Sequence, residues 1–342
     1  MMKKFGSLLM STLLCASLLA GCGSSASVSQ STVPETISTA EGAIETGSEE
    51  VSLEEMTAAK TETSTEALEE SSDDTVVRIG GLKGPTTMGL VKLMDDAKNG
   101  TAANNYEFTM VTAADELTGL VASGKVDIAL LPANVASVLY HKTEGKVSVI
   151  DITTLGVLYL VSGDSSISSI ENLSGKTVYL PGKGTTPEYV LRYLISASGL
   201  SGEAVTLEFK SEASAVAAVL EEDPNAIGLL PQPFVTAAIA QNDSLSVVLD
   251  LTKVWDSLQE DGSNSRLVTG VSIVNNEFLA AHKDLVDTFL TEHEASIAYT
   301  AADPEGAAAL IEKAGIVAKA AIAQKALPAC NITYLDGQDM KD

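Results

Sequence analysis

The stretch Val77-Arg-Ile-Gly-Gly-Leu-Lys-Gly-Pro-Thr-Thr87 joins an apolar run of strand type to a polar turn, and a helical pattern follows it. The same order returns about 100 residues later, in Val178-Tyr-Leu-Pro-Gly-Lys-Gly-Thr-Thr-Pro187. A second pair, Val126-Asp-Ile-Ala-Leu-Leu-Pro132 and Ala226-Ile-Gly-Leu-Leu-Pro231, has nearly the same spacing. Any α/β chain repeats strand and helix, but the shared Lys-Gly-x-Thr and Leu-Leu-Pro elements favour duplication of one α/β lobe.

The chain beyond residue 75 continues this alternation and is long enough for two lobes. Short apolar runs alternate with segments of helical periodicity, which predicts mostly parallel sheets flanked by crossover helices. The expected strands are residues 76–79, 107–111, 126–131, 147–150, 177–180, 205–209, 226–230 and 245–249. The expected helices include residues 88–98, 114–123, 189–198 and 212–222.

The first 22 residues have the pattern of an export signal. Lys3 and Lys4 precede an uncharged apolar run, residues 8–19, which is too short to span a bilayer. Leu19-Ala-Gly-Cys22 then resembles the lipobox of bacterial lipoproteins, in which the cleaved chain begins with an acylated cysteine. An ordinary secretory signal with an incidental cysteine remains the alternative. If Cys22 is acylated, only Cys330 keeps a thiol after cleavage, so no intramolecular disulfide is expected.

Residues 22–75 differ sharply in composition from the rest. Residues 23–75 carry thirteen acidic residues against the single Lys60 and have no aromatic residue, which predicts a disordered tether. The tether accounts for −12 of the total formal charge of −25 and the signal for +2, which leaves −15 for residues 76–342. That excess of negative charge argues against nucleic acid or an anionic lipid surface as a partner.

A lipobox, a polar tether and two α/β lobes together resemble the solute-binding proteins of ABC importers. The nearest resemblance is to the nitrate, sulfonate and taurine group, with its relatives that bind pyrimidine precursors of thiamine. It rests on Gly124-Lys-Val-Asp-Ile-Ala-Leu-Leu-Pro132 and on Ala301-Ala-Asp-Pro-Glu-Gly-Ala-Ala308, and it covers residues 76–342. These motifs are typical of the superfamily and say little about the ligand.

The resemblance implies a type II-like periplasmic-binding-protein fold, with two lobes joined by two crossing hinge segments. Residues 1–21 would be the signal, residues 76–161 with 268–342 the first lobe, and residues 162–267 the second, with crossings near Ser162 and Val268. The C-terminal helices would pack on the first lobe and the hinge. The implied protein is a lipid-anchored monomer outside the cytoplasmic membrane that captures a small molecule for an ABC permease and needs no cofactor.

Ligands of open parallel sheets bind beyond the carboxyl ends of the strands, where helix N-termini favour an anionic or accepting group. Threonine hydroxyls, amide side chains and lysines there could bind polar groups, and Met88 and Phe234 could wall an apolar part. The candidate ligand contacts are Lys83, Gly84, Pro85, Thr86, Thr87, Met88, Asn134, Lys183, Gly184, Thr185, Thr186, Gln232 and Phe234.

Structural roles compete with these assignments. Thr185-x-x-Glu188 is a capping-box pattern and Pro187 suits a first helical turn, so Thr185 is either a cap or a ligand contact. The lysines are either solvated or turned to the ligand. Trp255, the only tryptophan, fits peripheral packing better than a stacking platform. No arginine occurs in the predicted cleft segments, which disfavours a bidentate sulfonate or carboxylate clamp.

Catalytic chemistry finds no support in the motifs. Gly182-Lys-Gly-Thr-Thr186 lacks the spacing of a phosphate-binding P-loop, and no Gly-x-Ser-x-Gly nucleophile turn is present. His141, His282 and His293 lie far apart in the sequence, with no cysteine or carboxylate at the spacing of metal ligands, so no metal site is expected. Two other functions stay open: a receptor lipoprotein that reports ligand to a membrane sensor, and an enzyme resembling those that make thiamine-pyrimidine or menaquinone precursors. The export signal disfavours the enzyme, because those reactions are cytosolic.

Overall fold

A computed structural model describes residues 75–259, 263 and 265–341. The expected signal, Cys22 and the tether up to residue 74 lie outside the described residues. The strands are β1 (Val76–Leu82), β2 (Asn105–Val111), β3 (Ile128–Pro132), β4 (Val147–Thr154), β5 (Leu158–Ser162), β6 (Thr177–Pro181), β7 (Thr206–Lys210), β8 (Ile227–Pro231), β9 (Ser246–Asp250), β10 (Gly270–Asn275) and β11 (Ile332–Asp336).

The helices lie between these strands and after β10. The α-helices are α1 (Val91–Asn99), α2 (Ala114–Ala122), α3 (Ala133–Lys142), α4 (Thr186–Ala197), α5 (Ala213–Glu222), α6 (Phe234–Gln241), α7 (Leu251–Ser257), α8 (Asn276–Ala281), α9 (Lys283–Ala302), α10 (Pro304–Lys313) and α11 (Ala320–Ala326). The 3-10 helices are η1 (Pro85–Leu90), η2 (Ile170–Leu173) and η3 (Leu327–Ala329).

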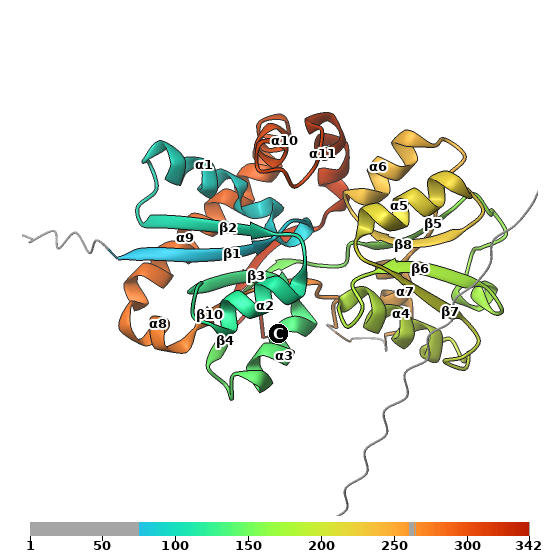
Figure 1. The fold of residues 1–342 in the computed structure, drawn as a ribbon, viewed down its shortest axis with the longest axis horizontal. Helices are drawn as coiled ribbons and strands as arrows, with labels where there is room; N and C mark the ends of the chain where they lie inside the picture. Colours follow the sequence, from blue (N-terminus) through green and yellow to red (C-terminus); the bar gives the residue numbers. More distant parts are fainter. Residues whose placement is uncertain (1–74, 260–262, 264, 342) are drawn as a thin grey trace, which may run out of the picture. The chain divides into compact units, whose positions relative to one another are not determined.

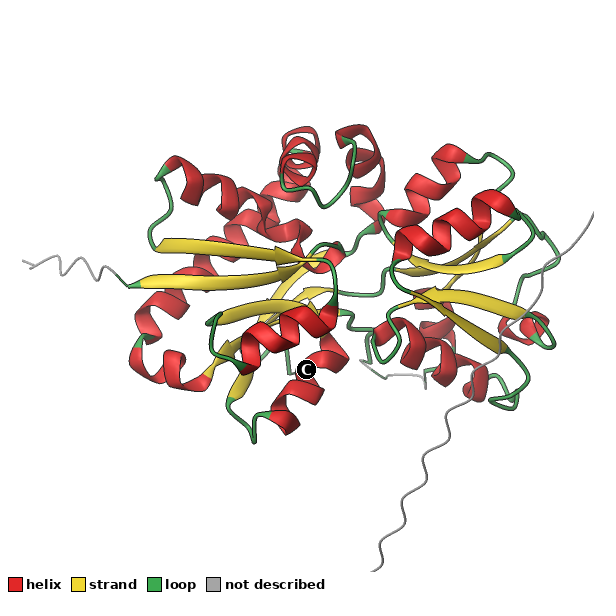
Figure 2. Cartoon of the chain, viewed as in Figure 1, coloured by secondary structure: helices red, strands yellow, loops and turns green. Residues whose placement is uncertain are grey.

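The strands form two sheets, each flanked by helices, which confirms the predicted α/β fold (Figure 1, Figure 2). One sheet has the order β11-β4-β10-β3-β1-β2, and the other has the order β7-β6-β8-β5-β9. We call the first sheet with its helices lobe 1 and the second with its helices lobe 2. All eight predicted strands are present; β5, β10 and β11 were not predicted.

The two sheets repeat one arrangement. In lobe 1, β1 pairs parallel with β2 and β3, and β10 lies antiparallel between β3 and β4. In lobe 2, β6 pairs parallel with β7 and β8, and β5 lies antiparallel between β8 and β9. The repeated sequence elements therefore occupy equivalent strands, as the duplication predicted, and each sheet receives one antiparallel strand just after the chain crosses between lobes.

The crossing segments can be located from the pairing. Thr154 ends β4 opposite Gly270 in lobe 1, whereas Leu158 begins β5 opposite Pro231 in lobe 2. The first crossing is therefore at residues 155–157, and the expectation of a crossing near Ser162 is corrected, because β5 belongs to lobe 2. The return lies between Leu267, which is buried in the core of lobe 2, and β10, close to the expected Val268.

Apolar cores lie on both faces of each sheet. In lobe 2, one core contains Leu191 and Leu194 of α4, and the other contains Val216 and Leu220 of α5. The faces of the lobe 1 sheet are covered in the same way, by α2 and α3 on one side and by α1 and α9 on the other. Burial on both faces explains why the central strands are continuous apolar runs instead of alternating ones.

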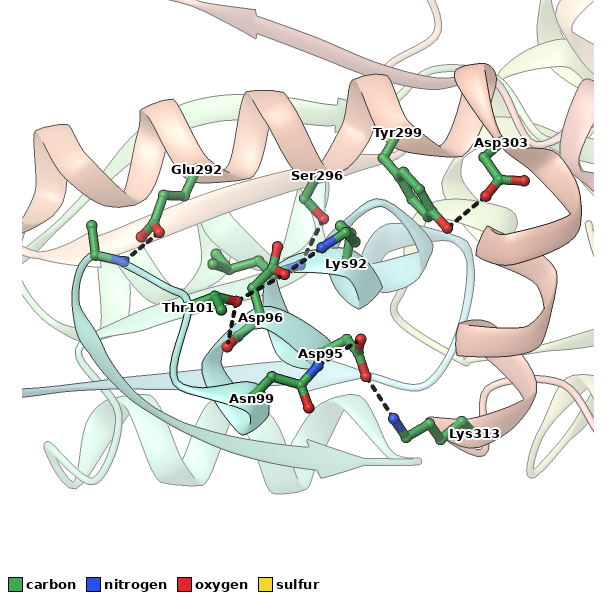
Figure 3. Close-up of polar contacts among 12 residues, drawn as sticks. Lys92, Asp95, Asp96, Asn99, Thr101, Glu292, Ser296, Tyr299, Asp303 and Lys313 are labelled. Atoms are coloured by element: carbon green, nitrogen blue, oxygen red, sulfur yellow. Dashed lines mark hydrogen bonds and ion pairs between the residues drawn. The ribbon is translucent and has the colours of Figure 1, made fainter.

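Buried hydrogen bonds and an exposed ion pair hold the C-terminal helices on lobe 1 (Figure 3). The Ser296 hydroxyl of α9 donates to the Gly89 carbonyl at 2.6 Å and accepts from the Leu93 N–H at 3.1 Å. Lys313 of α10 forms an ion pair with Asp95 of α1 at 2.5 Å. Near the hinge, Leu155 N–H donates to the Asn331 carbonyl at 3.1 Å, so the C-terminal segment also contacts the first crossing.

None of the helices within the described ranges is both long enough and apolar enough to cross a membrane.

Candidate functional site

A cavity of about 480 Å³ lies beyond the carboxyl ends of strands in both sheets. The strands β1, β2 and β3 of lobe 1 and β6, β7 and β8 of lobe 2 all end at its wall. It is lined by residues 82–86, 112–115, 132, 157–158, 181–183, 185–187, 210–213, 231, 234, 269 and 315–316. This is the position at which the strand-end rule places a ligand.

Eight of the thirteen sequence-predicted contacts line this cavity. They are Lys83, Gly84, Pro85 and Thr86 from lobe 1 and Lys183, Thr185, Thr186 and Phe234 from lobe 2. Repeated turns of the sequence, 83–86 and 183–186, thus face one space from opposite sides. Thr87, Met88, Asn134, Gly184 and Gln232 are not part of its lining.

Thr86 and Thr87 are neighbours with opposite environments. The Thr87 side chain is fully buried, and its hydroxyl donates to the Leu82 carbonyl at 2.6 Å and to the Gly84 carbonyl at 3.3 Å. Thr86 is only 6% exposed and lines the cavity, yet its Oγ1 has no hydrogen-bond partner in residues 75–259, 263 and 265–341. A buried hydroxyl without a partner costs free energy, so an acceptor in the cavity would stabilise it.

Met88 and Gln232 have structural partners. Met88 is fully buried among the C-terminal helices, in contact with Cys330, whose thiol pKa is raised to about 12 by burial. The Gln232 Oε1 atom accepts from the Thr236 hydroxyl at 2.8 Å and from the Thr236 N–H at 3.3 Å, across the start of α6. Both side chains are therefore engaged in packing or capping outside the cavity.

The capping box expected at Thr185 does not form; instead, Glu188 accepts from the N–H of Gly184, one residue before the N-cap. Thr185 is the N-cap residue of α4, but its hydroxyl donates backwards to the Gly182 carbonyl and caps no N–H. The Glu188 carboxylate accepts from the Gly184 N–H at 2.8 Å and from Arg192 Nε at 2.8 Å. These bonds lower the pKa of Glu188, against the opposing effect of burial, which is the larger single contribution. The turn uses Gly182 and Gly184 at φ values of 69° and 76°, which glycine adopts without strain.

Three lysines and two carboxylates line the cavity. Lys83 is half-buried and forms no ion pair within the described part of the chain. Lys183 and Lys210 extend over the rings of Phe209 and Tyr179, at 5.7 and 5.0 Å from the ring centroids. The carboxylates, Asp115 and Glu212, are exposed.

Helix ends add to this charge. The α-helices α2, α4, α5 and α6 begin at the cavity wall, and their first N–H groups favour an anion or a strong acceptor. The cavity is therefore more positive than the folded part of the chain as a whole, whose formal charge is −15 over residues 76–342.

Sequence reasoning missed the contributions of β2 and β7. Residues 112–115 and 210–213 line the cavity because these parallel strands end at the same edges as their neighbours. Both are strand-to-helix turns at equivalent positions of the duplication, so extending the repeat would have found them. Gly315 and Ile316 could not have been found in this way, because they reach the cavity through the packing of α10 and α11.

Asn134 joins the two lobes at the cavity's margin. Its Nδ2 donates to the Gly184 carbonyl at 2.8 Å, and its Oδ1 accepts from the Thr186 hydroxyl at 3.0 Å. Asn134 stands at the start of α3, and Thr186 at the start of α4. Both functional groups of this side chain are thus occupied by protein atoms of the opposite lobe.

Comparison with known proteins places the fold. Similar solved structures include an ABC transporter protein from Parabacteroides distasonis, with a TM-score of 0.63 and 23% identity over 78% of this chain and 89% of that one. The periplasmic aliphatic sulphonate binding protein SsuA of Escherichia coli has a TM-score of 0.62 and 15% identity, over 76% and 80% of the two chains. The alkanesulfonate-binding protein SsuA of Xanthomonas axonopodis pv. citri, bound to MOPS, has a TM-score of 0.60 and 16% identity, over 78% of this chain and 89% of that one.

These likenesses show a shared two-lobe fold. No curated protein matches the sequence. The sequence profile of the family described as NMT1/THI5 like matches residues 107–307, from β2 in lobe 1 through all of lobe 2 and back to α10. Because that match covers more than half of the sequence, the chain belongs to the NMT1/THI5 like family.

Proposed function

We propose that this protein is the solute-binding component of an ABC importer and that it captures a small molecule in the cavity between its lobes. The observation that carries the proposal is Thr86, which lines the cavity and whose buried Oγ1 has no hydrogen-bond partner among the residues that the structure describes. A polar group in that position is stabilised only when something in the cavity accepts its hydrogen bond. The sulfonate-binding proteins of similar fold support the same conclusion.

The proposed solute is a small organic anion with an apolar part. The lining has three lysines against two carboxylates, with Lys210 also in an ion pair with Glu208 at 3.8 Å, and four helix N-termini add to the positive potential. Phe234 and Ile316 supply apolar wall. The described lining residues include no arginine, so the anion would be held by point charges and N–H groups in place of a bidentate fork. A cavity of about 480 Å³ suits a compound of that size.

Thermal unfolding of the full-length protein tests this proposal. The panel contains ethanesulfonate, taurine, MOPS, nitrate and pyrimidine precursors of thiamine, with uncharged analogues of the organic anions as controls. A ligand at about one hundred times its Kd stabilises the native state by about 2.7 kcal/mol, which raises the Tm by roughly 5 °C for a protein of this size. We expect an organic anion of the panel to raise the Tm, and its uncharged analogue to raise the Tm by less. Equal Tm values for all compounds at millimolar concentration would contradict the proposal.

Lipid anchoring through Cys22 is part of the same proposal. The support is the sequence Leu19-Ala-Gly-Cys22 and the acidic segment that separates it from the first strand, β1. Anchored outside the membrane by a tether, the two lobes would be free to meet a permease. The tether would also isolate the anchor from the binding cavity.

Replacing Cys22 by serine is expected to release the protein from salt-washed membranes into the soluble fraction, because serine offers no thiol for acylation. The matched control is Cys15→Ser, which changes a cysteine inside the expected signal and leaves the lipobox intact. Fractionation and immunoblotting measure the result. A Cys22→Ser protein that stays in the membrane fraction, or a Cys15→Ser protein that leaves it, would disprove the anchor at Cys22.

A further inference from the structure

The sequence predicted that the Asn134 side chain contacts ligand, but in the structure this side chain forms hydrogen bonds to lobe 2. Its amide donates to the Gly184 carbonyl at 2.8 Å and accepts from the Thr186 hydroxyl at 3.0 Å. Donor and acceptor are therefore both used, and both partners belong to the other lobe. Asn134 does not line the cavity.

The partners of Asn134 are themselves part of the binding cavity. Thr186 lines it and is 7% exposed, and Asn134 is the partner recorded for its hydroxyl. Gly184 lies in the turn between two lining segments, 181–183 and 185–187, and its N–H is held by Glu188. The bonds to Asn134 thus connect α3 of lobe 1 directly to the cavity wall of lobe 2.

We infer that Asn134 is a positioning residue that latches the lobes together, so that its two hydrogen bonds set the equilibrium between open and closed forms before any ligand binds. This inference rests on the proposed function, because closure of the two lobes has a biological role only if it traps a solute. It forms at the two helix starts, so it breaks when the lobes separate and re-forms when they close. A side chain that only contacted ligand would have no effect on the empty protein.

The latch predicts different contributions from its two bonds. A typical protein hydrogen bond adds about 0.5–1.5 kcal/mol net, and 1.4 kcal/mol corresponds to a tenfold change in an equilibrium constant. Asn134→Ala, which removes both bonds, should lower the ratio of closed to open protein about tenfold. Thr186→Val, which removes one bond, should lower it about threefold. The double variant should match Asn134→Ala, because Thr186 loses the same partner in both cases.

The ratio can be measured as a distance distribution between two spin labels in the absence of ligand. Ser123→Cys at the end of α2 and Ser196→Cys on α4 are exposed positions, one in each lobe. The labels are attached to the full-length chain carrying Cys15→Ser and Cys22→Ser. The remaining Cys330 is buried, and burial raises the pKa of its thiol to about 12, so we expect no label at this position. Asn99→Ala on α1 is the matched control, since that amide donates to Asp95 within its own helix.

The expected result is a mixture of short and long distances in the unaltered protein, with the short population reduced in Asn134→Ala and Thr186→Val but not in Asn99→Ala. An unchanged distance distribution in Asn134→Ala would overturn the latch. The latch would also be overturned if the labelled chain without a further substitution showed the long distance alone. Because these measurements need no ligand, they fail or succeed independently of the thermal-shift panel. If the distance distributions change as expected but no compound of the panel raises the Tm, the role of Asn134 in the lobe equilibrium stands and the proposed class of solute is wrong.

Discussion

Replacing Thr86 by valine is expected to weaken ligand binding roughly five- to 150-fold while leaving the unliganded protein at least as stable as before. Valine keeps the volume of the side chain and removes a hydroxyl that has no hydrogen-bond partner within the described part of the chain. The ligand acceptor would lose its donor, and an unpaired buried acceptor costs about 1–3 kcal/mol. Titration calorimetry with ethanesulfonate, or with the panel compound that gives a larger thermal shift, measures the affinity.

The neighbouring substitution Thr87→Val is the matched comparison. Its hydroxyl donates to the Leu82 carbonyl inside the protein, so valine should lower the free energy of unfolding by about 1–3 kcal/mol. Affinity should change much less than in Thr86→Val. If Thr86→Val instead destabilises the empty protein and binds as tightly as the unaltered chain, Thr86 has a structural role and the ligand lies elsewhere.

Replacing His293 by leucine is expected to reduce the free energy of unfolding by about 1–3 kcal/mol, the typical cost of leaving a buried hydrogen-bonding group without its partner. His293 Nδ1 lies 2.8 Å from Asp151 Oδ2, and both side chains are fully inaccessible to solvent. The pair joins α9 to β4, and Ser272 N–H of β10 donates to Asp151 at 3.2 Å. Leucine would leave the Asp151 carboxyl buried without its main partner.

Two further variants make this prediction specific. Asp151→Asn combined with His293→Leu should recover a large part of the loss, since it removes the isolated carboxyl and keeps an acceptor for Ser272 N–H. His141→Leu, at an exposed position on α3, should change stability by less than about 0.5 kcal/mol. Chemical denaturation measures all three. A loss below about 1 kcal/mol in His293→Leu would show that the pair does not stabilise lobe 1.

Much of the fold could be predicted because strand and helix periodicities are local. The eight predicted strands follow from apolar runs that end at polar turns, and all eight occur. The boundary of lobe 2 was placed too late, because β5 directly follows the crossing and its apolar sequence is compatible with either sheet. Only its pairing with β8 and β9 assigns it to lobe 2. The same holds for β10 and β11, which extend lobe 1 from far along the chain.

The candidate site divides in the same way. The sequence by itself determined that the turns at residues 83–86 and 183–186 follow equivalent strands, and strand direction then brings them to one cavity. It could not separate Thr86 from Thr87, because these adjacent residues of one 3-10 helix have different surroundings: Thr86 lines the cavity, whereas the Thr87 hydroxyl donates to the Leu82 carbonyl. Nor could it assign Asn134, whose partners lie 50 and 52 residues away on the other lobe. Burial and hydrogen-bond partners depend on which segments meet in space, so only the tertiary structure decided those roles.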